Sequence, residues 1–100
     1  MQTLIKDKSA AVGATSVLVA EECFQERVFL SVVNTSTGAQ VISLAFGQEA
    51  VAGQGIVLYP GGYYAESKDA QPITQKQIQA IASAAGGTIA VQERVSMRGV

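Results

Sequence analysis

The stretch from Val28 to Tyr64 constrains the fold most, because three strand-like runs and two sharp turns follow one another within it. Neighbouring side chains of a β-strand lie on opposite faces, and in residues 28–33 both sets are largely apolar. A strand that is apolar on both faces is typical of the interior of a sheet, or of a sheet covered by a second layer. The sequence therefore predicts an all-β fold, either a single small antiparallel β-sandwich or a jelly-roll-like barrel.

Polar and glycine-rich segments predict how these strands are connected. Residues 34–38, Asn-Thr-Ser-Thr-Gly, predict a hairpin turn into the apolar run 41–46, because asparagine and serine side chains bond the local backbone and Gly38 accepts a positive φ. Residues 48–55 combine small residues with two glycines and predict a surface loop that crosses between sheets. The Pro-Gly-Gly of residues 60–62 predicts a sharp corner.

The rest of the chain is expected to add further strands, a possible N-terminal arm and a C-terminal tail. Residues 15–20 predict a short strand, while residues 2–6 fit either a short strand or part of an extended N-terminal arm that spans residues 1–8. Residues 73–85 fit either a helix or a strand, and we favour a hairpin with the alternating run 88–93 because that pairing gives every backbone group a partner. Residues 95–100 are predicted to form a tail.

Length and composition indicate one folded domain that spans residues 1–100. With 48% hydrophobic and 15% charged residues the chain can build one core, and a domain this small gains from packing against copies of itself, so a homo-oligomer is expected. A formal net charge of -1 argues against direct binding of nucleic acid. No signal peptide and no apolar run long enough to span a membrane are recognised, so the protein is expected to act without export.

The residues that most enzymes use are scarce in this sequence. It contains no histidine and a single cysteine, Cys23, beside Glu22 and Phe24, so zinc binding and an activated thiol are not expected. The acidic pairs at 21–22 and at 66 and 69 are predicted to be solvated charges. We therefore expect no catalytic residue, no cofactor, no metal site and no enzymatic activity.

The tyrosines after the Pro-Gly-Gly corner allow two interpretations. Tyr63 and Tyr64 are more typical of half-buried core residues with a hydrogen-bonded hydroxyl group. The alternative is a stacking surface that they form together with Tyr59.

The order of these motifs resembles that of small virion structural proteins of bacteriophages. In that family a strand ending in Asn-x-Ser is followed by a "glycine, aliphatic, x, leucine, x, Pro-Gly" corner and a closing hairpin, all within a β-sandwich. The matching segments here are Arg-Val-Phe-Leu-Ser-Val-Val-Asn at 27–34, Leu-Ala-Phe-Gly at 44–47, Gly-Ile-Val-Leu-Tyr-Pro-Gly-Gly at 55–62, Ile-Gln-Ala-Ile-Ala at 78–82 and Gly-Gly-Thr at 86–88.

The resemblance implies a minor capsid, decoration or vertex protein that is assembled in the host cytoplasm and located in the virion. Its partners would be the major capsid protein, other virion proteins and further copies of itself. Within this hypothesis Leu4 and Ile5 are the expected anchors on the shell. The alternative is a receptor- or carbohydrate-binding module of a phage tail or adhesin, in which Tyr59, Tyr63 and Tyr64 contact the ligand.

Overall fold

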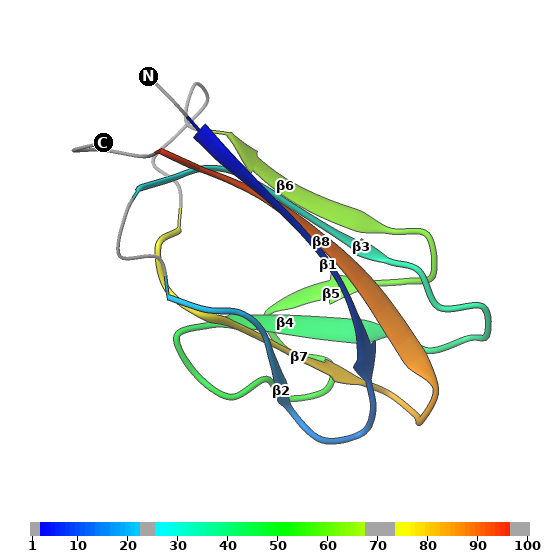
Figure 1. Ribbon diagram of the computed structural model, residues 1–100. Coiled ribbons are helices and arrows are strands. Elements are labelled where there is room, and N and C mark those ends of the chain that lie inside the picture. Colours follow the sequence, from blue (N-terminus) through cyan, green and yellow to red (C-terminus); the bar gives the residue numbers. More distant parts are fainter. Residues whose placement is uncertain (1–2, 23–25, 68–73, 97–100) are drawn as a thin grey trace.

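The computed structural model describes residues 3–22, 26–67 and 74–96, which form two facing four-stranded sheets without a helix (Figure 1). The strands are β1 (Thr3–Val12), β2 (Val17–Ala20), β3 (Glu26–Asn34), β4 (Ile42–Phe46), β5 (Ile56–Leu58), β6 (Tyr63–Ser67), β7 (Ile78–Ala82) and β8 (Gly87–Ser96). The sheet orders are β1-β8-β3-β6 and β2-β7-β4-β5, and all neighbours are antiparallel. This is a jelly-roll arrangement. The predicted all-β fold is confirmed.

The core lies between the two sheets and is made of inward-facing residues from both. Burying one valine, leucine or isoleucine side chain contributes about 1.5–3 kcal/mol, so this layer is the main source of stability. Its buried members are Val12, Val19, Ala20, Leu30, Val32, Ile42, Leu44, Leu58, Ile78, Ala80, Ala82, Ile89 and Val91.

The polar turn after β3 does not close a hairpin. β3 ends at Asn34 in one sheet and β4 begins at Ile42 in the other, and each pairs with other strands. Gly38 is not among the glycines with a positive φ. The predicted hairpin is therefore wrong, and residues 35–41 form a crossover. The corner at 60–62 is a second crossover, which leads from β5 to β6.

The side chain of Asn34 explains why the chain crosses between sheets at this point. It is completely buried, and its Nδ2 donates hydrogen bonds to the carbonyl oxygens of Gln40 and Leu58, both at 2.9 Å. Its backbone N–H donates to the Gly62 carbonyl at 2.9 Å, and its carbonyl accepts from the Gly61 N–H at 2.8 Å. One asparagine thus holds both crossovers together at the same end of the sandwich.

The glycine-rich loop between β4 and β5 is the true hairpin connection. β4 and β5 are neighbours in one sheet, with Leu44 opposite Ile56. The prediction that residues 48–55 cross between sheets is therefore wrong. Gly55 has a φ of +76°, and a Cβ there would collide with the Leu44 carbonyl oxygen, so the tight return of the chain requires glycine at this position.

The segment that fitted either a helix or a strand contains strand β7, and the predicted strand at 88–93 lies in β8. The strand interpretation of residues 78–82 is confirmed, but the hairpin is wrong because the two strands belong to different sheets. β7 lies between β2 and β4, and β8 lies between β1 and β3. Residue 73 lies outside the described residues.

The described parts of the predicted N-terminal arm and C-terminal tail belong to strands of the sheet that contains β3. The described part of residues 1–8 is no arm, because β1 pairs with β8 from Thr3 opposite Ser96 to Val12 opposite Gly87. The predicted tail begins too early, since Val95 and Ser96 are buried in β8. Residues 1–2 and 97–100 lie outside the described residues.

Candidate interaction surface

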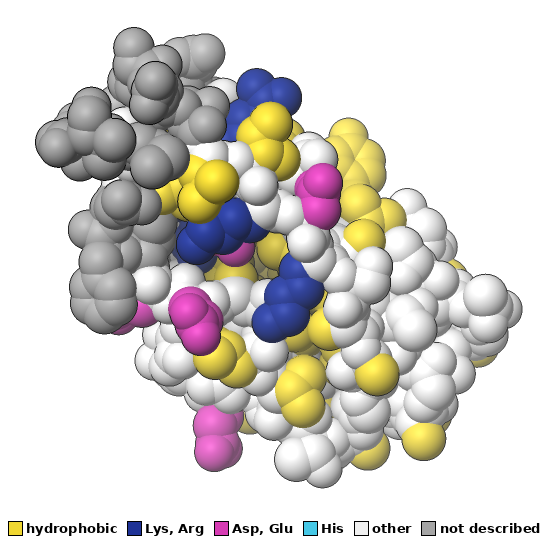
Figure 2. Space-filling view, viewed as in Figure 1, with side chains coloured by type: hydrophobic (Ala, Val, Ile, Leu, Met, Phe, Trp, Pro, Cys, Tyr) yellow, Lys and Arg dark blue, Asp and Glu magenta, His cyan; other side chains and the backbone are white. Residues whose placement is uncertain are grey.

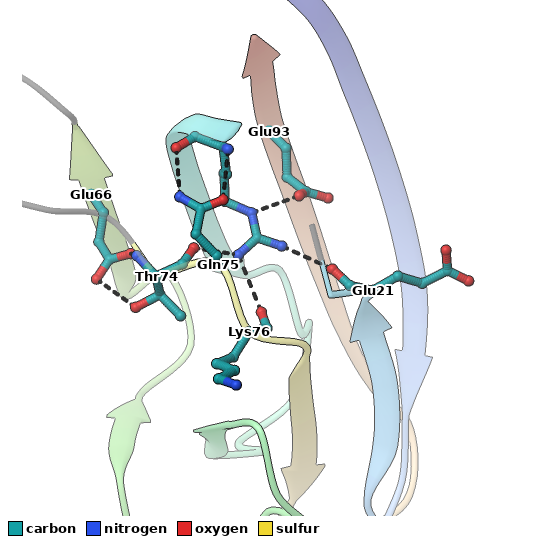
Figure 3. Close-up of polar contacts among 7 residues, drawn as sticks. Glu21, Glu66, Thr74, Gln75, Lys76 and Glu93 are labelled. Carbon is teal, nitrogen blue, oxygen red and sulfur yellow. Dashed lines mark hydrogen bonds and ion pairs between the residues drawn. The ribbon is translucent and has the colours of Figure 1, made fainter. Parts of the chain in front are cut away.

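A buried arginine organises the polar contacts at one end of the sandwich (Figure 3). Arg27 on β3 is 0% exposed, and its Nε donates to Glu93 Oε2 at 2.8 Å in an ion pair. Its Nη1 donates to the carbonyl oxygens of Thr74 at 2.6 Å and Lys76 at 3.2 Å, and its Nη2 donates to the Glu21 carbonyl at 3.0 Å. The guanidinium fork therefore joins segments that are far apart in the sequence.

Two further contacts attach the segment before β7 to the opposite sheet. The Gln75 side chain accepts from the Arg27 N–H at 2.7 Å and donates to the Arg27 carbonyl at 3.0 Å. Glu66 on β6 accepts from the backbone N–H of Thr74 at 3.0 Å and from its hydroxyl group at 3.2 Å. These acceptors and donors are occupied by structural partners, which fixes the path of residues 74–77.

The prediction that the acidic residues are solvated is wrong for Glu66. Glu93 was not predicted to be buried either. Both are buried, whereas Glu21 and Glu22 are exposed as predicted, and Asp69 lies outside the described residues. The burial of Glu93 could have been predicted from the sequence, because Glu93 falls at an inward-facing position in the alternating pattern of β8. Arg27 was harder to find, since the register of β3 shifts between residues 27 and 29 and breaks the pattern that would assign its face.

The two adjacent tyrosines of β6 lie on opposite faces of the sheet. Tyr64 packs against the core, with its ring centroid 6.0 Å from that of Phe46, and its hydroxyl donates to Glu66 Oε2 at 2.6 Å. Burial, followed by the hydrogen bond and the negative charge of Glu66, raises the pKa of Tyr64 to about 12. Tyr63 is 71% exposed. The half-buried interpretation is confirmed for Tyr64 and is wrong for Tyr63, and because the two side chains lie on opposite faces they cannot share a stacking surface.

The predicted anchors Leu4 and Ile5 lie on β1, which forms an edge of its sheet. They too point to opposite faces, and their exposed fractions are 43% and 53%. The inward-facing position of Leu4 follows from its pairing with buried Val95, while Ile5 lies opposite exposed Arg94 on the outer face. The structure thus presents both side chains to solvent along one edge.

Most of the exposed large hydrophobic residues of the described chain lie at the edges of the sandwich. One group, Leu4, Ile5 and Leu18, is on the side of the edge strands β1 and β2. The other, Tyr59 and Tyr63, is on the side of β5 and β6, in the β5–β6 corner and β6 itself. Val51 lies in the β4–β5 loop, where the backbone N–H of Ala50 donates to the hydroxyl group of Ser16 at 2.9 Å.

A cleft of about 910 Å³ opens between the sheets on the β1 and β2 side. Lys6 and Lys8 line it from β1, Leu18 and Val19 from β2, and Glu93 from β8. Figure 2 shows this hollow face with basic and acidic side chains around it. Because Asp7, Glu21 and Glu22 line the cleft together with the two lysines and Glu93, it combines an apolar wall with charges of both signs.

Among residues 3–22, 26–67 and 74–96 there is no group of three or more histidine, cysteine, aspartate or glutamate residues placed to hold a metal ion. The same residues include no helix that is long and apolar enough to cross a membrane. Cys23 lies outside them.

Comparison with known proteins places the chain by its fold. No family model matches the sequence, and no curated protein matches it. A chain of the Bacillus endospore appendages, described as disulfide-linked pili, superposes with a TM-score of 0.55 at 15% identity, covering 95% of this chain and 87% of that one. The coat protein of Tobacco streak virus gives a TM-score of 0.46 at 7% identity, covering 98% and 88% of the two chains. The likeness to the pilus chain shows a shared fold.

Proposed function

We propose that this protein is a non-enzymatic structural subunit of a bacteriophage virion, where it binds the shell as a minor capsid, decoration or vertex protein. The observation that carries this proposal is the distribution of side chains. The buried charged groups Arg27, Glu66 and Glu93 are hydrogen-bonded within the fold, while most of the exposed large hydrophobic residues lie along its edges. This division suits a rigid body that is joined to neighbours rather than a reaction centre.

Two other features support an assembled role. Exposed apolar groups at sheet edges stay unfavourably hydrated until a partner covers them, so their position favours contacts made side by side. The sequence resemblance to phage virion proteins supplies the kind of particle. A particle subunit also needs a fold that is maintained without a ligand, and the two crossovers tied by Asn34 provide one.

The test is incorporation of edge variants into particles. In a host that produces the parent particle, the chain is replaced by the double variant Leu4→Asp/Ile5→Asp, and its occupancy on purified particles is measured by mass spectrometry. We expect occupancy to be lost while the isolated variant keeps its circular dichroism spectrum. Ala84→Asp/Ala85→Asp in the exposed β7–β8 turn is the matched control and should be incorporated normally. Unchanged occupancy of the Leu4 and Ile5 variant would refute the anchors.

A receptor- or carbohydrate-binding module is the second candidate, and one observation favours it. Tyr59 and Tyr63 are 68% and 71% exposed on the same side of the sandwich, which leaves their rings open to stacking. A glycan array is the direct assay. Binding that is lost in Tyr59→Ala and Tyr63→Ala, in a protein absent from purified particles, would favour this candidate over the structural one.

A further inference from the structure

Each side of the sandwich ends in two edge strands, one from each sheet. β1 and β2 are the terminal strands on one side, and β6 and β5 are the terminal strands on the other. An edge strand has backbone N–H and C=O groups that no strand of its own sheet satisfies, so it can accept a strand from another molecule. Taking the proposed structural role as its basis, we propose that the β1/β2 side of one copy docks against the β5/β6 side of another, so that copies associate head to tail.

Strand direction makes this contact possible in both sheets at once. Each sheet has four strands, and all neighbouring pairs are antiparallel, so the two terminal strands of a sheet run in opposite directions. When a second copy is placed beside the first in the same orientation, its β1 meets β6 as an antiparallel neighbour. Its β2 meets β5 in the same way. The two sheets then continue from copy to copy in the antiparallel pattern that they have within one copy.

Both sides also expose large hydrophobic side chains. Leu4, Ile5 and Leu18 lie on the docking side, and Tyr59 and Tyr63 lie on the receiving side. Head-to-tail contact covers both groups together and leaves neither in water. The cleft beside β1 and β2 lies on the same side, so the docked copy would cover its apolar wall as well.

Charge disfavours the symmetric alternative, in which β1 pairs with β1 of a second copy. Residues on the same face must lie opposite one another in such a pair. The registers that pair most of the strand are centred on Asp7 or Lys8. The first sets Lys6 against the second copy's Lys8, and the other sets Lys8 against itself, and like charges directly opposite are destabilising. β5 and β6 contain no lysine or arginine, so the head-to-tail contact avoids this repulsion.

A complementation experiment tests the orientation of the contact. Ile5→Asp damages one side and Tyr63→Asp damages the other, and both positions are exposed, so neither change should unfold the protein. Sedimentation velocity of the purified chain over a range of concentrations should show growing oligomers for the wild type. Each variant alone should associate roughly tenfold or more weakly. Ala84→Asp is the control for added charge and should associate like the wild type.

Mixing the two variants gives the decisive result. The Ile5→Asp chain keeps an intact β5/β6 side, and the Tyr63→Asp chain keeps an intact β1/β2 side, so the mixture should form a one-to-one dimer that grows no further, as measured by native mass spectrometry. Leu18→Asp and Tyr59→Asp form a second pair if either first variant shows an altered circular dichroism spectrum.

Three results would overturn the head-to-tail contact. These are a wild-type chain that stays monomeric at all concentrations, variants that associate as well as the wild type, and loss in Ile5→Asp alone, which would indicate the symmetric β1 pair. The proposed function is judged separately by particle occupancy. A monomeric chain that is still incorporated into particles would refute the self-contact and leave the virion role standing.

Discussion

Replacing Arg27 by methionine should cause one of the largest losses of stability available to a single substitution in this protein. Methionine keeps an unbranched apolar chain in the space of the arginine stem but removes every guanidinium donor. Glu93 then loses its ion-pair partner at 2.8 Å, and the carbonyl oxygens of Thr74, Lys76 and Glu21 lose theirs. The backbone contacts between Arg27 and Gln75 do not depend on this side chain.

The expected magnitude follows from the burial of the two charges. Breaking a buried ion pair by removing one partner costs about 3–5 kcal/mol, because the other charge stays buried without compensation. The side chain of Arg27 is 0% exposed and that of Glu93 is 12% exposed, so some water can reach the carboxylate. We therefore expect a decrease of about 3 kcal/mol in the free energy of unfolding, at the lower end of that range. Small domains have a total of about 5–15 kcal/mol.

Urea unfolding followed by circular dichroism measures the effect, since the chain has no tryptophan. Arg94→Met is the matched control, because Arg94 undergoes the same chemical change but is exposed and lies 5.8 Å from the centre of the Phe29 ring. Arg94→Met should lower the free energy of unfolding by about 1 kcal/mol or less. The double variant Arg27→Met/Glu93→Leu removes both charges and should recover a large part of the loss.

Two outcomes would contradict this reasoning. If Arg27→Met differs from Arg94→Met by less than about 1 kcal/mol, the guanidinium does not hold the crossover before β7 in the way its contacts indicate. If the double variant is as unstable as Arg27→Met alone, the cost comes from the lost carbonyl contacts rather than from the unpaired carboxylate.

The other predictions concern the connections and one titrating group. Asn34→Ala removes two buried donors and should lower the free energy of unfolding by about 2–4 kcal/mol, measured by urea unfolding. Gly55→Ala should lower the free energy of unfolding clearly more than Gly53→Ala in the same urea experiment, because both glycines have a positive φ but only a Cβ at 55 meets the Leu44 carbonyl; equal losses would contradict this close contact. Since folding raises the pKa of Tyr64 from 10.0 to about 12, the neutral phenol stabilises the fold fully below pH 10, and this contribution should decline between pH 10 and 12; Tyr64→Phe should remove that decline in urea midpoints.

Local sequence patterns predicted the strands well but gave the wrong partners. The alternation in residues 28–33 and 88–93 correctly indicated β3 and β8, because it reports which side chains face the core. The turn-forming residues at 34–38 suggested a hairpin, yet they lie in a crossover. Asparagine, serine and glycine favour a change of direction without specifying which sheet the next strand joins. The partner is decided by contacts such as Asn34 with Leu58, which are distant in sequence.

The candidate surface was predictable only in part. Leu4 and Ile5 were predicted as surface anchors, and the structure presents them to solvent, whereas Tyr63 was predicted to be half-buried and is exposed. The division of such residues between two opposite sides could not be predicted, because it depends on which strands end each sheet. Leu18 lies in the predicted strand of residues 15–20, but the sequence did not indicate that this strand ends its sheet.

The position of β7 and β8 determines when the fold can be completed. The last two described strands to be synthesised occupy interior positions, β7 between β2 and β4 and β8 between β1 and β3. During synthesis β1 therefore has no strand to pair with in its own sheet until β8 has been made. Such long-range pairing slows folding and leaves edges exposed in the meantime. The charges of Lys6, Asp7 and Lys8 lie in this unpaired strand, where they would discourage the β1 strands of two nascent chains from pairing with each other before each chain has completed its own sheets.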